Sequence, residues 1–200
     1  LGIPPLVTGV VFAAITFAVI IGGIERIGRV ASAVVPFMAI VYVGGALTIL
    51  LAHLGEIPAA LSLIVQDAFT AQALAGGAIG VMIQKGIARG VFSNEAGLGT
   101  APIAQAAAKP GDPVLQGSVA MLGTFIDTII VCSITGLAIV SSGAWTSGEE
   151  GAPLSALAFS STFGDFGNVI VAGGLAIFAF TTLLGWSLYS ERCTQFLFGD

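Results

Sequence analysis

The chain has 200 residues, of which 56% are hydrophobic and only 8% are charged, and its mean hydropathy is +1.03. A soluble domain carries roughly a quarter charged residues, so we expect much of this surface to face lipid rather than water. The net charge of −5 gives no electrostatic footprint for nucleic acid, the hydrophobicity excludes intrinsic disorder, and two cysteines exclude a disulfide scaffold. Because the chain opens on Leu1 and lacks a basic leader, we expect an interior piece of a longer membrane protein.

Four stretches are long and apolar enough to be membrane-spanning helices, which need about 20 residues each. They are 6–24, 34–52, 114–140 and 168–189. Most of them carry small residues such as Gly44-Gly45, which allow helices to approach closely within lipid. The sequence therefore predicts an all-α integral membrane protein.

The stretch 76–108 is different, because it contains seven glycines, Pro102 and three charged residues. The distribution of positive charge nevertheless predicts that it crosses the membrane. Lysine and arginine occur in 25–33, 109–113 and 190–200, whereas the connections 53–75 and 141–167 carry only acidic charge. By the positive-inside rule the first three segments are cytoplasmic and the two connections face outward. We therefore expect one transmembrane domain over 1–200 with about five spans, of which 76–108 is broken.

Both outer connections are predicted to contain a short helix. Apolar residues recur at helical spacing from Leu54 to Ala68, which predicts an amphipathic helix. Pro153 is well placed in the first turn of a helix over Pro153–Ser161. Lids over a pathway and ordinary interfacial helices are both compatible with this pattern.

Residues 90–100 form the most informative stretch of the chain. Three glycines, Ser93 and Asn94 are poor helix propagators, and helix-compatible runs flank them at 78–89 and 101–108. We predict two half-helices with an unwound middle at membrane depth, which must be buried in protein or line a wet cavity. Transporters build substrate sites from such breaks, where freed N–H groups bind a carboxylate and freed carbonyls bind a cation or ammonium. The alternative is a re-entrant or kinked helix that only packs.

The run 86–104, GIARGVFSNEAGLGTAPIA, resembles the signature of the alanine or glycine:cation symporter family. Further landmarks of that family are matched by Ile57-Pro58, Asp127-Thr128-Ile129 and the run 180–187, FTTLLGWS, followed by Glu191-Arg192. The resemblance implies part of a LeuT-type inverted-repeat fold, in which the five crossings correspond to helices 4 to 8. It also implies sodium-coupled symport of small neutral amino acids, alanine or glycine, across the cytoplasmic membrane by alternating access. On the broken segment we expect Phe92, Ser93, Asn94 and Gly97 to line the substrate site.

The last span carries a second group of candidate residues. Thr182 and Trp186 are four residues apart and therefore share one helix face. From spacing alone, back-bonded threonines and an interfacial tryptophan are the simpler interpretation. The resemblance instead implies that Thr181 and Thr182 bind sodium through their hydroxyl oxygens, and that Thr182 and Trp186 also contact the substrate.

Two acidic residues lie at predicted membrane depth. Asp127 lies inside the fourth span and requires a partner, for which Lys85 and Arg89 are the nearest cations in sequence. It either steers an ion or pins the broken helix, and we favour pinning. Glu95 either caps the freed N–H groups of the second half-helix or contacts a ligand.

The sequence does not support an enzyme. It has no Gly-x-Ser-x-Gly elbow and no P-loop, and one histidine with two distant cysteines cannot form a usual zinc site. The expected partners are alanine or glycine, sodium as the coupling ion, and the lipid bilayer. The alternatives are a channel or passive pore with a re-entrant segment, or a purely structural membrane subunit.

Overall fold

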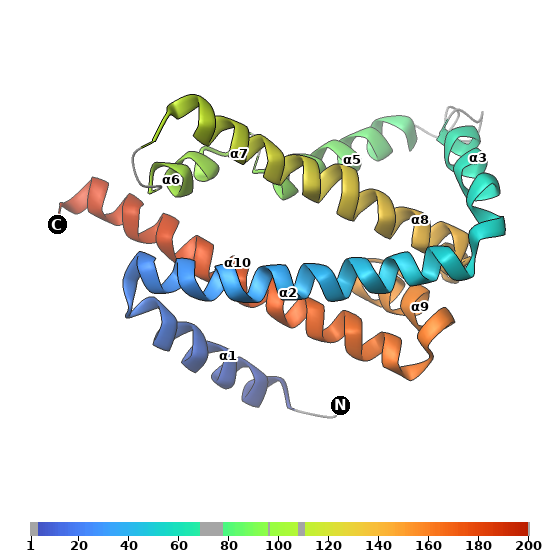
Figure 1. Ribbon diagram of the computed structural model, residues 1–200, viewed down its shortest axis with the longest axis horizontal. Helices are drawn as coiled ribbons and strands as arrows, with labels where there is room; N and C mark the ends of the chain where they lie inside the picture. The colour runs from blue at the N-terminus through green and yellow to red at the C-terminus, as the bar shows by residue number, and fades with distance from the viewer. Residues whose placement is uncertain (1–3, 69–77, 96, 108–110, 200) are drawn as a thin grey trace. The chain divides into compact units, whose positions relative to one another are not determined.

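The structure is a computed structural model that describes residues 4–68, 78–95, 97–107 and 111–199, and every regular element in these ranges is a helix. This confirms the all-α class, whereas the LeuT-type arrangement remains an expectation. In chain order (Figure 1) the elements are α1 (Pro5–Ile20), α2 (Gly23–Ala52), η1 (Leu54–Glu56), α3 (Ile57–Ala68), α5 (Ala78–Ser93), α6 (Thr100–Ala106), α7 (Pro113–Phe125), η2 (Ile126–Cys132), α8 (Ser133–Ser141), η3 (Ala144–Ser147), α9 (Ala152–Phe163) and α10 (Asp165–Phe198).

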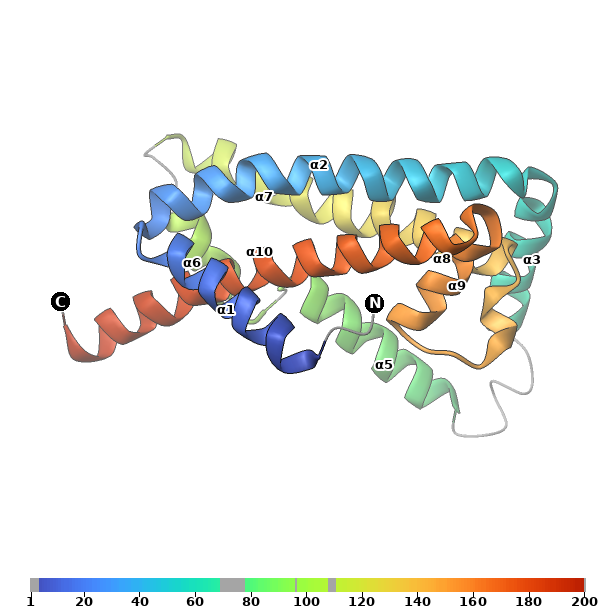
Figure 2. The same cartoon turned by 90° about the horizontal axis from the view of Figure 1, so that it is seen from below.

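Three helical runs among the described residues are long and apolar enough to cross a membrane. They are α2, the continuous run α7–η2–α8, and α10, while the apolar helix α1 is shorter. Figure 2 shows α7 and α8 continuing one another without a loop. Large apolar side chains on these helices face outward, as at Met121, which is 72% exposed. An exposed apolar surface of this extent is typical of a protein that lipid surrounds.

Helix α2 begins at Gly23, so residues 25–33, which separate the first two predicted spans, are themselves helical. Charged residues end a membrane span but not a helix, since glutamate and arginine propagate a helix well. Residues 53–68 and 152–163 contain α3 and α9, so the helices predicted for the two outer connections are present.

The chain divides into two compact units, of which the first contains Leu1–Tyr42 and Ala172–Asp200. Its buried core joins Val19 of α1, Ile27 of α2 and Leu184 of α10. Tyr42 and Phe178 add an edge-to-face ring contact with centroids 6.4 Å apart. Apolar side chains from three helices therefore hold this unit together.

The second unit contains Val43–Val171. Its largest fully buried side chain is Phe159 of α9, which lies against Gly45 of α2. A Cβ at Gly45 would lie 2.8 Å from the Phe159 ring, and one at Gly167 would lie 2.5 Å from the Phe159 carbonyl carbon. The absence of side chains at both glycines therefore allows the close approach of α9.

Candidate functional site

The helix predicted to be broken is interrupted between α5 and α6. In this interval Glu95, Gly97 and Gly99 have φ angles of 52°, 76° and 80°, which are left-handed and stop helical winding. The interruption begins later than predicted, because α5 continues past Gly90 to Ser93. A single glycine costs a helix only about 1 kcal/mol, so Gly90 does not end it. Ser93 is therefore the last residue of helix α5 and does not belong to the unwound segment.

Two side-chain hydrogen bonds join the end of α5 to η2. Ser93 Oγ donates to Asp127 Oδ2 at 2.6 Å, and Thr128 Oγ1 donates to Asn94 Oδ1 at 2.9 Å. We call this pair of hydrogen bonds the clasp. Asn94 also donates from Nδ2 to the Gly90 carbonyl oxygen at 3.0 Å, which fixes its amide in the orientation that accepts from Thr128.

The clasp residues of the fourth span lie in a π-helical segment, η2, within an otherwise α-helical run. The π-helix is rare, and when it occurs inside α-helices it is frequent at functional sites, because the wider turn redirects side chains. In η2 it coincides with the two residues that reach the break, Asp127 and Thr128.

The structure gives Asp127 a hydroxyl partner that the sequence analysis did not name. Its carboxylate accepts a hydrogen bond from the Ser93 hydroxyl, and no ion pair joins it to Arg89 within the described residues. The side chain of Lys85, the other predicted partner, lies outside the described residues. Asp127 is thus attached through a hydroxyl to the end of the first half-helix, α5.

Glu95 has a hydrogen-bond partner on the second half-helix. Its Oε2 accepts a hydrogen bond from Thr100 Oγ1 at 2.7 Å. Because Thr100 is the first residue of α6, this bond spans the break and fixes the turn between the half-helices.

A pocket of about 210 Å³ lies between the break and the fourth span. Its walls combine small side chains, which make room for the pocket, with polar side chains. The lining residues are Ser93, Asn94, Glu95, Ala101, Ala120, Gly123, Thr124 and Asp127. Helix α6 is connected to the opposite wall by Gln116, whose amide donates to Gln105 Oε1. The pocket therefore combines hydroxyl, amide and carboxylate groups with little apolar bulk.

Of the predicted substrate residues, Ser93 and Asn94 line this pocket, whereas Phe92 and Gly97 do not. Phe92 is 67% exposed in the last turn of α5, and Gly97 lies in the turn that follows. The sequence analysis missed Thr124 as a lining residue and Thr128 as the partner of Asn94. Their signal was a position beside, or one turn before, the partly buried acid Asp127.

The predicted residues of the last span belong to the other unit and are described within it. Thr181 Oγ1 donates to the carbonyl oxygens of Ile177 and Phe178, each at 3.1 Å, so the back-bonded interpretation holds for this hydroxyl. Thr182 and Trp186 are both exposed on α10, and Trp186 packs edge-on against Tyr189. Their assignment to sodium and substrate remains a proposal.

Comparison with known proteins gives a consistent result. The sequence profile of the sodium:alanine symporter family matches residues 1–200. An uncharacterized transporter of Haemophilus influenzae is 49% identical over 98% of this chain, and a sodium/alanine symporter of Methanococcus maripaludis is 47% identical over 99%. A sodium/proton-dependent alanine carrier protein of a Bacillus species is 34% identical over 98%. The chain spans 44%, 44% and 47% of these proteins, so it corresponds to less than half of each.

Proposed function

The chain belongs to the sodium:alanine symporter family, whose members are transporters and not enzymes. From this premise we propose that it forms part of a secondary transporter that couples sodium entry to uptake of a small neutral amino acid, such as alanine or glycine. The proposed mechanism is alternating access around a site at the broken helix, in a multi-pass protein of the cytoplasmic membrane.

One observation carries this proposal: the break between α5 and α6 is joined by the clasp to an acidic π-helical segment, beside a pocket of about 210 Å³. A helix that only packs would not need two polar bonds from its end to residues 34 positions away. Backbone outside a helix is tolerated at membrane depth only in protein or beside water, and this break lies beside a polar pocket.

The pocket suits a zwitterionic ligand. Hydroxyl, amide and carboxylate groups face it, and these groups suit the charged ends of an amino acid. Carbonyl groups at the C-terminal end of α5 and the Asp127 carboxylate favour the ammonium end. The Thr124 hydroxyl, which also lines the pocket, is a suitable donor for the carboxylate end.

For the co-transported sodium we propose Thr181 and Thr182. The hydroxyl of Thr181 uses its hydrogen to bond its own helix, which leaves oxygen lone pairs that can bind a small cation. Carbonyl oxygens from parts of the full protein beyond this chain would complete the shell. Trp186, four residues after Thr182, would form a wall of the substrate pocket.

The test is uptake of labelled L-alanine by the full-length protein in proteoliposomes with an inward sodium gradient. We expect accumulation above the equilibrium level, which requires sodium and collapses when the gradient is removed. A channel or passive pore cannot accumulate its solute, so equilibration without accumulation would contradict the proposal.

Gly97→Val should abolish this uptake while membrane insertion remains intact. The matched control is Gly9→Val on helix α1. It adds the same side chain in open space, at a glycine that does not have a positive φ angle. Unchanged uptake in Gly97→Val, or equal loss in both variants, would contradict the assignment of the break to the substrate site.

A further inference from the structure

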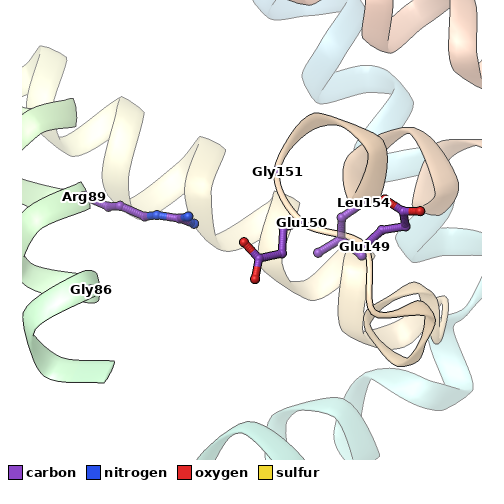
Figure 3. Close-up of a pocket in the computed structure, with 6 residues that line it drawn as sticks. All are labelled: Gly86, Arg89, Glu149, Glu150, Gly151 and Leu154. Carbon is purple, nitrogen blue, oxygen red and sulfur yellow. The ribbon is translucent and has the colours of Figure 1, made fainter. Parts of the chain in front are cut away.

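A second pocket in the same unit is larger than the one at the break and carries opposite charges on its walls. Its volume is about 370 Å³, and Gly86, Arg89, Glu149, Glu150, Gly151 and Leu154 line it. One wall comes from α5 and the other from the segment that leads into α9. Figure 3 shows the Arg89 side chain extending from α5 toward the Glu150 carboxylate, whereas the Glu149 carboxylate points away, to the far side of its loop.

The two facing charges do not neutralise each other directly. Among the described residues Arg89 and Glu150 form no ion pair with any group, and the pocket separates them. An arginine in an apolar, membrane-protein helix is costly unless it faces water or a partner. A guanidinium and a carboxylate on opposite walls therefore form a site that is complementary to a ligand carrying both charges.

The position of this pocket along α5 relates it to the site at the break. Arg89 precedes Ser93 by four residues, which places the two side chains on the same helix face, about 6 Å apart along the axis. Arg89 lines the larger pocket and Ser93 lines the smaller one. A ligand in the larger pocket would thus lie about one helical turn from the clasp.

We propose that the pocket between Arg89 and Glu150 is a second binding site for a zwitterionic amino acid, separate from the site at the break. Arg89 binds the carboxylate through its paired N–H donors, and Glu150 binds the ammonium. The proposal rests on the proposed function, because it takes a transported amino acid as the ligand. The walls of this pocket carry one positive and one negative group, so the site selects for a ligand that has both charges.

The experiment is equilibrium binding of labelled L-alanine to the purified full-length protein in lipid nanodiscs with sodium present. We expect the wild type to bind two molecules of alanine per chain. In Arg89→Gln and in Glu150→Gln the affinity of the second site should fall roughly tenfold or more, so that only one molecule binds at concentrations that fill both sites of the wild type. Glu149→Gln, which removes the neighbouring charge that points away from the pocket, should still bind two.

A variant of the other site makes the test independent of folding defects. Gly97→Val should also bind one molecule, and the double variant Gly97→Val/Arg89→Gln should bind none. Propionate lacks the ammonium and ethylamine lacks the carboxylate, so each should displace the molecule remaining in Gly97→Val at least tenfold more weakly than unlabelled alanine does.

Several results would overturn the inference. One molecule per chain in the wild type, with sodium-driven uptake intact and no change in Arg89→Gln, would reject the second site and leave the proposed function standing. One molecule per chain, with uptake lost in Arg89→Glu and restored by adding Glu150→Arg, would assign the two residues to a direct ion pair instead. Absence of both alanine binding and uptake in the wild type would reject the proposed function and this inference together.

Discussion

The turn at Gly97 allows the contribution of backbone strain to be separated from that of side-chain volume. Gly97 has a φ of 76°, and a Cβ added there would meet no atom within 4 Å. A substitution therefore acts through the backbone, at about 1–2 kcal/mol for an ordinary L-residue. Asparagine visits this region more readily and should cost less, whereas β-branched valine should cost more.

These energies convert into a graded series of affinities. If binding needs the left-handed turn, Gly97→Ala should reduce the apparent alanine affinity by up to roughly 5–30-fold, because the competent fraction falls by that factor. Gly97→Asn should be milder, and Gly97→Val should be the most severe. The assay is the KM for labelled alanine uptake in proteoliposomes at saturating sodium, with the rate normalised to the amount of folded protein.

The rank of Gly97→Asn in the series separates the two explanations. Asparagine is larger than alanine, so if the substitution acted by filling the site, the KM for alanine would rise more in Gly97→Asn than in Gly97→Ala. That order would refute the backbone argument.

The remaining predictions concern the clasp, the sodium site and the topology. Ser93→Ala removes the donor to the Asp127 carboxylate and should lower the free energy of unfolding by about 1.5–3 kcal/mol, seen as a lower thermal midpoint. Ser93→Thr is the control because it keeps the hydroxyl, and equal midpoints in the two variants would count against the clasp. Thr128→Val should lower the free energy of unfolding less, by about 0.5–1.5 kcal/mol, because both partners of its hydrogen bond are neutral. A larger loss of stability than in Ser93→Ala would contradict this ranking. Thr181→Ala and Thr182→Ala should raise the half-saturating sodium concentration for uptake about tenfold, with alanine affinity recovering at high sodium; unshifted curves in both would place the ion elsewhere. Ser32→Cys and Gly148→Cys should react with an impermeant thiol reagent from opposite faces of the membrane, and labelling from one face would exclude a crossing by 76–108.

The sequence predicted those features that follow from local chemistry. The break was readable because Gly97 and Gly99 allow left-handed backbone, and the start of α9 because Pro153 suits a first helical turn. The helical structure of 25–33 was not predicted, because hydropathy reports the end of the lipid contact and not the end of the helix.

Features that depend on tertiary contacts could not be predicted in the same way. The hydrogen bond between Ser93 and Asp127 joins residues 34 positions apart, so their positions in the sequence gave no sign of it. The π-helical winding of η2 has no composition signal, since Ile126–Cys132 is as apolar as the α-helical turns around it. Likewise, Glu149 and Glu150 are alike in sequence, and only the loop geometry gives one of them the side facing Arg89.

The winding of η2 also determines how much chain the fourth span holds. A π-helical segment holds more residues per turn than an α-helix, so η2 carries surplus chain between α7 and α8. Its geometry is that of an extra residue accommodated within a helix. A relative with plain α winding at this point would be one residue shorter, with both flanking helices still facing the same way. An insertion into regular α winding would instead turn every later residue of the span by about 100°.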